Sequence, residues 1–440
     1  MHYLRPHFHR RHWDIEIAEY YVFQTIFGVA YKTASLFLPI YFLSIGYSLR
    51  DIALWFVINE LFFVCFIPFA GKIVNWLGVK KSIALKLPVL ALFYFGVQHL
   101  SGNLWADAPL ALSLLALRAA GKSPAEIAED VFMAKHVLRK SRGRMLALTK
   151  IFSVLAGIIS PVVGGLIAYA FGFNAMFSAG CILMLVAAIP LFMTPDEHFA
   201  CGYSAGRVAA FPFRAANHPY LVAETGRTLP DTLVWIMWPL FIYFVVKNPA
   251  NMGVLISVSA LLSMILSYYV GKWIDESNPD RLLKKGVRSS TGLFFFRALS
   301  VHPVLMSLAD IGSDLLSPLV DLPYDYYVYG YIRRQKDQIE YVNAKEFIEE
   351  LLCFTGTLLI LLATLFDPQP NALFFVSVFA LFALLRPLMR HVTKLGARAL
   401  PAPIGAPSLG ATPEEALRKA TRVAAIARNA RRRARARRSG

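Results

Sequence analysis

Long apolar blocks separated by short polar connections run through most of the chain. Two of them are "ALWFVINELFFVCFIPFA" and "GTLLILLATLF". A block of about 20 apolar residues matches the ~30 Å hydrocarbon core of a bilayer. The pattern therefore predicts an all-α membrane protein with 12 transmembrane helices. The predicted spans are 17–44, 52–70, 82–102, 107–133, 146–170, 174–193, 219–246, 252–270, 287–301, 304–329, 344–366 and 371–389.

The composition excludes a water-soluble globular domain of this size. Hydrophobic residues make up 57% of the 440-residue chain and charged residues 17%, against about 25% charged residues in an ordinary soluble domain. The four cysteines form no C-x-x-C pair, so we predict neither a disulfide nor a metal centre. No nucleotide-binding loop or nucleophile–base cluster is evident. We predict that the protein is not an enzyme and needs no cofactor.

Lysine and arginine gather in alternate connections between the predicted spans. The second, fourth, sixth, eighth and tenth connections carry them, for example in "KHVLRKSRGR" and "DRLLKKGVR", whereas "AYAFGFN" and "DPQPN" have none. Cation-rich short loops remain in the cytoplasm. We therefore predict a multi-pass protein of the cell membrane with both termini in the cytoplasm.

Two short basic stretches 200 residues apart indicate an internal repeat. They are "GKIVNWLGVKK" from Gly71 and "GKWIDESNPDRLLKK" from Gly271, and Pro39 and Pro239 keep the same spacing. We predict two parallel six-helix repeats around a central cavity, an architecture known among transporters. The N-terminal half is 1–193, a cytoplasmic loop is 194–218, and the C-terminal half is 219–393.

Over about residues 15–392 the chain resembles the major facilitator superfamily, whose helices two and three are joined by a G-x-x-x-D-x-x-G-(R/K)-(R/K) loop. The stretch "GIISPVVGG" is similar to that family's antiporter motif. The resemblance implies twelve helices and a loop that helps to hold the halves together. It also implies gating roles for the matching residues, with Asn75 where the family has Asp. These residues are Gly71, Asn75, Gly78, Lys80, Lys81, Gly157, Pro161, Gly164, Gly165, Gly271 and Asp275.

Charged side chains within the predicted spans select the helices that line the cavity in this family. An ionisable group at mid-bilayer costs at least about 2.5–3.5 kcal/mol, so it is expected to face protein or water. The first, fourth, seventh and tenth predicted spans carry most such groups, often three or four residues apart on one helix face. The resulting candidates for a substrate or proton site are Gln24, Lys32, Arg118, Lys122, Glu126, Glu224, Arg227, Asp231, Asp310 and Asp314.

The candidate charges differ in sign between the two halves. Near mid-span the N-terminal half offers cations such as Lys32, and the C-terminal half offers anions such as Asp231 and Asp314. A carboxylate changes its proton affinity when it moves between a cation and an apolar setting. We therefore select Asp231 and Asp314 as first candidates for proton coupling. The alternative is that these charges form permanent structural ion pairs.

The last segment, 394–440, differs in character from the rest of the chain. From Leu395 onwards it has ten arginines and one lysine against two glutamates, a net charge of +9 within the total of +17. We predict a disordered cytoplasmic tail that is attracted to anionic lipid, at about 1 kcal/mol per cation near the surface. We expect no nucleic-acid partner.

Taken together, these patterns favour a secondary active transporter of a small solute that works by alternating access. The antiporter-like stretch favours proton-coupled export by a monomer. Uptake of a sugar or organic acid is one alternative. The other is a non-transporting sensor or lipid-handling protein on the same fold.

Overall fold

The computed structural model describes residues 5–136, 142–193, 203–214, 217–276, 279–300, 302–332, 338–366 and 372–390. By its internal contacts the chain divides into Met1–Ala402 and Pro403–Gly440, so all described residues belong to the first unit. The predicted basic tail 394–440 and residues 194–202 of the predicted central loop lie outside the described residues. So does the side chain of Asp275.

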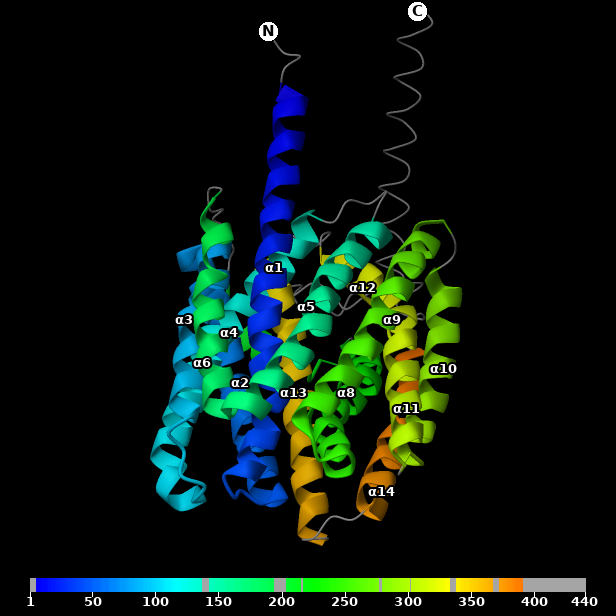
Figure 1. Cartoon of the computed structure of the whole chain (residues 1–440). Helices are drawn as coiled ribbons and strands as arrows, with labels where there is room; N and C mark the ends of the chain where they lie inside the picture. Colours follow the sequence, from blue (N-terminus) through cyan, green and yellow to red (C-terminus); the bar gives the residue numbers. More distant parts are fainter. Residues whose placement is uncertain are drawn as a thin grey trace, which may run out of the picture. The chain divides into compact units, whose positions relative to one another are not determined.

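The described part of the chain is helical, and each predicted span overlaps one or more helices. Seven helices are long and apolar enough to cross a membrane, and two shorter apolar helices are Leu155–Phe171 and Ser377–Met389. The helices are α1 (Arg5–Ser44), α2 (Leu49–Leu77), α3 (Val79–Val97), α4 (Leu104–His136), α5 (Arg142–Phe171), α6 (Phe173–Val186), α7 (Ala205–Ala209), α8 (His218–Val246), α9 (Pro249–Glu276), α10 (Pro279–Ala298), α11 (Pro303–Leu316), α12 (Pro318–Ile332), α13 (Gln338–Phe366) and α14 (Ala372–Ala383), with 3₁₀ turns η1 (Ile189–Phe192) and η3 (Arg386–Arg390). Figure 1 shows α3, α4 and α6 at one side of the bundle and α9, α10 and α11 at the other.

Local sequence explains where several of these helices begin. Ser48 and Asp51 form a capping box at the start of α2, with each side chain accepting from the other residue's backbone N–H. Gly78 separates α2 from α3 with φ of 96°, a backbone conformation that glycine adopts without steric cost. At the start of α4, Asp107 accepts hydrogen bonds from the backbone N–H groups of Ser101 and Gly102.

The tenth predicted span, 304–329, is interrupted in the structure. It forms α11 and α12, which meet at Ser317 and Pro318. Proline lacks a backbone N–H and its ring clashes with the preceding turn, so it ends or kinks a helix at this position. The interruption matters because interrupted helices in transporters commonly lie at binding sites.

Two helix pairs form extensive contacts between the N-terminal and C-terminal parts of the chain. One pair is α5 with α9, and the other is α2 with α13. Glycines make the first contact close: a Cβ on Gly165 would lie 2.5 Å from the carbonyl oxygen of Pro249, and one on Gly253 would overlap the carbonyl oxygen of Pro161. The "SPVVGG" stretch of α5 therefore packs directly against the backbone of α9.

We expect Gly253→Ala to destabilise the protein, because the new methyl group would meet backbone atoms of α5 that cannot rotate away. Overpacking of this kind costs about 1–3 kcal/mol. Thermal unfolding of the purified protein should show a clear fall in the midpoint. Gly292→Ala in α10 is the matched control, since no atom lies within 4 Å of its Cβ position. Equal midpoints for the two variants would contradict the close approach of α5 and α9.

The second contact includes a segment of the central loop, around α7. The Tyr203 hydroxyl donates to the carbonyl oxygen of Pro68 in α2 and accepts from the Asn343 amide in α13. A Cβ on Gly71 would lie 2.5 Å from the Tyr203 ring, so this glycine makes room for the tyrosine. On α7, Arg207 contacts Glu340 of α13 at 2.8 Å. The segment thus binds α2 and α13 at the same place.

Candidate functional site

A cavity of about 410 Å³ lies between helices from both ends of the chain. This is within the range of about 300–1,000 Å³ that is usual for small-molecule sites. Helices α1 and α5 supply one part of the wall, and α8, α9, α10 and α11 supply the rest. Its lining residues are Tyr31, Lys32, Ser35, Leu36, Gly157, Pro161, Val234, Trp235, Trp238, Pro239, Ile242, Ile256, Ala260, Ser263, Arg297, Asp310, Asp314 and Ser317.

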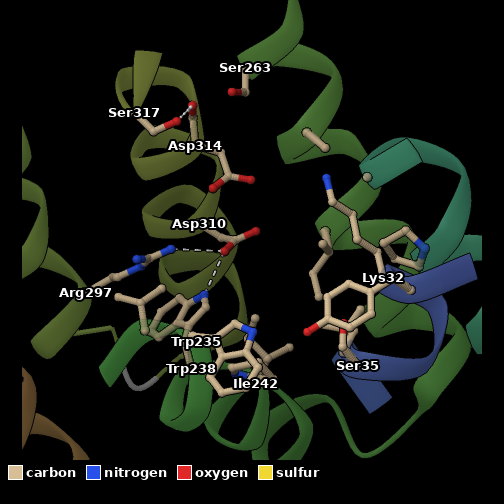
Figure 2. A pocket seen from close by; sticks show the side chains of 18 residues that line it. Lys32, Ser35, Trp235, Trp238, Ile242, Ser263, Arg297, Asp310, Asp314 and Ser317 are labelled. Carbon is tan, nitrogen blue, oxygen red and sulfur yellow. Dashed lines mark hydrogen bonds and ion pairs between the residues drawn. The ribbon is translucent and has the colours of Figure 1, made fainter. Parts of the chain in front are cut away.

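Opposite charges occupy opposite walls of this cavity. Figure 2 shows Lys32 of α1 on one side and Asp310 and Asp314 of α11 on the other. Apolar side chains such as Trp235 and Ile242 form much of the surface between them. The cavity can therefore hold a small molecule that meets a cation, an anion and an apolar surface at once.

Asp310 is held by donors from three helices. Its Oδ1 accepts from Trp238 Nε1 at 2.7 Å and from an Arg297 guanidinium nitrogen at 3.3 Å, and its Oδ2 accepts from Ser259 Oγ at 2.6 Å. The Arg297 guanidinium also lies 4.4 Å from the centre of the Trp238 ring, in a cation–π arrangement. Asp310 and Arg297 are both buried. They form a neutral pair that is fixed in the wall.

Asp314 lies one helical turn beyond Asp310, next to the interruption between α11 and α12. The Ser317 hydroxyl donates to the backbone carbonyl oxygen of Asp314 at 3.2 Å. Both residues line the cavity. Asp314 is the second carboxylate of this wall, and its charge also acts on the Arg297 cation.

Arg118 and Gln24 lie outside the lining of the central cavity. Arg118 is buried, binds the Asn59 side chain of α2, and lies 3.4 Å from the Tyr31 hydroxyl. Because Tyr31 lines the cavity, Arg118 supports that wall from behind. Gln24 donates to Tyr20 at 2.5 Å, one turn earlier on α1.

A second cavity of about 240 Å³ is lined by other charged residues that were predicted from the sequence. Lys122 and Glu126 form an ion pair one turn apart on α4, and Glu126 lines this cavity together with Arg227. Across it, Lys345 of α13 contacts Asp130 of α4 at 2.9 Å. The ion pair between Lys345 and Asp130 thus connects α4 with α13.

The predicted charges of the seventh span lie outside the lining of the central cavity. Glu224 is buried, contacts Arg227 at 3.4 Å and accepts a hydrogen bond from Tyr324. Asp231 contacts Arg386 of η3 at 3.0 Å. None of the three lines the central cavity.

The loop-motif residues lie partly in packed contacts and partly at the surface of the helices. Gly71 packs against Tyr203 as described, Gly271 is buried, and Lys80 lies 3.5 Å from Glu19 of α1. Lys81 is exposed. Gly164 packs against Thr33 of α1, so the antiporter-like stretch contacts α1 as well as α9.

Two buried cations that line the cavities were missed by the sequence interpretation. Arg297 was not selected, although an arginine within the apolar run "FFFRALS" is a signal of a buried cation. Lys345 was also missed, although "NAKEFIEE" places several charges at the start of an apolar block. Both signals were available, but the partners of these cations could not be read from the sequence.

One group among the described residues has the spacing of metal ligands. The ligand atoms of Glu60, Glu350 and Cys353 lie within 4.8 Å of one another, at the contact between α2 and α13. Protein groups already satisfy part of this set, since Asn59 donates to Glu60 at 2.8 Å and Thr232 to the Cys353 sulfur at 3.5 Å. We assign no metal to it.

Comparison with known proteins gives a family match and a fold match. A model of the Major Facilitator Superfamily matches residues 20–320. Among solved structures, a variant of the E. coli fucose:proton symporter FucP is similar at 16% sequence identity with a TM-score of 0.58, and the match covers 86% of this chain and 99% of that one. At this identity the likeness shows the fold alone. Comparison with curated protein sequences gives no match.

Proposed function

The chain belongs to the major facilitator superfamily, and from that premise we propose that it moves a small solute by alternating access through the central cavity. The observation that carries the proposal is the position of this cavity. Its walls come from α1 and α5 at one end of the chain and from α8 to α11 at the other. Relative movement of the two groups of helices would therefore change the shape of the cavity.

The pattern of helix contacts supports a two-fold relation between the halves. If α8 to α14 repeat α1 to α6 in order, α2 corresponds to α9 and α5 corresponds to α13. The contact of α2 with α13 then corresponds to the contact of α9 with α5, and both contacts are present. Rocking of two repeats about a central site is the usual form of alternating access.

We propose proton exchange as the energy source, with Asp314 as the proton-binding residue. Asp310 already accepts three donors, including the Arg297 cation, so protonation there would break a fixed pair. Asp314 faces the same cavity one helical turn further along α11, beside the helix interruption at Ser317 and Pro318. A solute and a proton that compete for one carboxylate would cross in opposite directions, which favours export over symport.

The test uses proteoliposomes that contain a pH-sensitive dye. If solute and protons exchange, a solute added outside should make the lumen more alkaline, because protons leave as the solute enters. Symport, as in sugar or organic-acid uptake, would make the lumen more acidic. Absence of both proton movement and solute counterflow for every solute that the purified protein binds would contradict transport and favour the sensor alternative.

Asp231→Asn should leave this proton movement largely unchanged, because Asp231 contacts Arg386 and lies outside the cavity lining. We expect an initial rate within about twofold of the wild-type rate. The expected defect is lower thermal stability, since the buried Arg386 loses its anion. Asp231→Asn combined with Arg386→Met should recover that stability. Loss of proton movement in a well-folded Asp231→Asn protein would instead assign the coupling role to Asp231.

A further inference from the structure

Two buried carboxyl groups meet at the contact between α2 and α13, which joins the N-terminal and C-terminal parts of the chain (Figure 1). Glu60 of α2 and Glu350 of α13 are both buried, and their side chains are hydrogen-bonded to each other. Asn59 donates to the Oε1 atom of Glu60 at 2.8 Å. A hydrogen bond between two carboxyl groups requires a proton on one of them, because an ionised carboxylate can only accept.

The charged groups of α4 that face this Glu60–Glu350 pair leave one negative charge uncompensated. The charge of Glu60 acts on Arg118. The charges of Lys122 and Glu126, which form an ion pair with each other, act on Glu350. Three carboxylates therefore face two cations at this place. A single proton on the pair would make the group neutral, and an uncompensated charge in a buried site is strongly unfavourable.

The other titratable groups near the pair lie on α13. Cys353 lies beside both carboxyl groups, and Thr232 of α8 donates to its sulfur at 3.5 Å. The charge of Glu349 also acts on Cys353, and Glu349 contacts Lys345 at 3.5 Å. None of these three residues adds a cation to the pair itself.

We propose that Glu60 and Glu350 share one proton while α2 and α13 are in contact, and that this proton holds the two halves of the protein together here. When the helices separate, water reaches both carboxyl groups and both ionise. Opening of the contact therefore releases the proton, and closing takes it up again. Because the closed contact binds one more proton than the open one, a higher pH favours opening. The proposal goes beyond the proposed function, since it concerns the contact between the halves rather than the solute.

A shared proton and a set of permanent ion pairs make different predictions for single substitutions. If both carboxyl groups are ionised and paired with the cations of α4, then Glu60→Gln or Glu350→Gln leaves a buried cation without an anion. If they share a proton, either substitution removes one carboxylate together with the need for the proton. The group of charges then stays neutral.

Infrared difference spectroscopy of the purified full-length protein at neutral pH detects the shared proton directly. A protonated carboxyl group has a C=O stretching band that an ionised one lacks. We expect Glu60→Gln and Glu350→Gln each to lose one such band relative to the wild-type protein. Glu129→Gln is the matched control and should lose none, because Glu129 forms an ion pair with Lys86. A band that survives either substitution in the pair would overturn the shared proton.

Thermal unfolding of the same variants gives an independent readout. Each single substitution in the pair should shift the midpoint only slightly, whereas Glu60→Gln combined with Glu350→Gln leaves two cations facing one carboxylate and should lower it markedly. Glu129→Gln should also lower it, since the buried Lys86 loses its anion. If both single variants are as unstable as Glu129→Gln, the carboxylates are permanent partners of the cations and the proposal fails.

Spin labels test whether the proton holds the helices together. The labels are attached to an unnatural keto amino acid at Phe69 of α2 and at Leu359 of α13, two exposed positions. Raising the pH from about 7 to about 9, a range in which buried carboxyl groups can ionise, should shift the wild-type distances to longer values. Glu60→Gln should abolish this shift, and Glu276→Gln, at an exposed residue of α9, should retain it. An unchanged wild-type distance, or the same shift in Glu60→Gln, would overturn the proposal.

The outcomes separate this proposal from the proposed function. Loss of the infrared band and of the pH-dependent distance in Glu60→Gln, without counterflow of any solute by the wild-type protein, would support the proton at this contact and contradict transport. Counterflow by a wild-type protein whose band survives in Glu60→Gln would leave transport standing and overturn the shared proton.

Discussion

Asp314→Asn is expected to abolish proton movement driven by solute, with the initial rate reduced at least tenfold. The amide has nearly the shape of the carboxylate but takes up no proton between pH 5 and 8. Asp314 lines the cavity beside the helix interruption at Ser317 and Pro318, where solute and proton would compete. The measurement is the pH-dye signal in proteoliposomes at matched protein density.

The pH dependence of solute binding gives the same prediction a second readout. In the wild-type protein, acidification should weaken binding, because the proton and the solute would compete for Asp314. In Asp314→Asn the remaining weak binding should not change with pH over the same range. Glu276→Gln, at an exposed residue at the end of α9 and outside the cavity lining, is the control and should keep the wild-type dependence. Wild-type proton movement by a folded Asp314→Asn protein would exclude Asp314 as the coupling residue.

Asp310→Ala is expected to lower the free energy of unfolding by about 3–5 kcal/mol, the usual cost of removing one partner of a buried ion pair. The substitution removes the anion that hydrogen-bonds to the Arg297 guanidinium, and it also removes the acceptor of Trp238 Nε1 and Ser259 Oγ. Arg297 has only 4% of its surface exposed, so water would replace the carboxylate poorly. The measurement is thermal unfolding of the purified variant, where the midpoint should fall markedly.

A second substitution distinguishes loss of the pair from loss of packing. Asp310→Ala combined with Arg297→Met removes both charges and keeps much of the apolar volume, so most of the stability should return. Coupled effects of this kind are expected for residues in one contact network. If the double variant is no more stable than Asp310→Ala alone, the cost arises from packing around Trp238 and Ser259 rather than from the unpaired cation.

The positions of the helices along the chain could largely be predicted from sequence. Which helices pack against each other could not. The spans were predicted from the lengths of the apolar blocks and the cations between them, and each predicted span overlaps a helix of the structure. This prediction succeeds because the thickness of a bilayer constrains each span separately. The interruption of the tenth span was missed, although Pro318 lies within it. Proline is tolerated in many membrane helices. A proline alone therefore does not distinguish a kink from a break.

For the candidate site, too, the sequence predicted which residues matter but not what they contact. Lys32, Asp310 and Asp314 were selected because charge is costly in a bilayer, and all three line the cavity. Asp231 was selected by the same argument but contacts Arg386, which lies 155 residues later in the chain. The cost of burying a charge predicts that a partner exists. It carries no information on which partner, because that depends on how distant helices pack.

The contacts of Tyr203 have a consequence for experiments that divide the chain. A connection that only tethers two halves can be cut or lengthened without loss, and split halves then assemble when they are produced together. Here the connection supplies a side chain that hydrogen-bonds to both α2 and α13 and packs against Gly71. A split placed after residue 214 keeps Tyr203 on the N-terminal fragment, and such fragments should reassemble. Fragments that omit residues 203–214 should lack a structural component of the α2–α13 contact, however well each half inserts into the membrane.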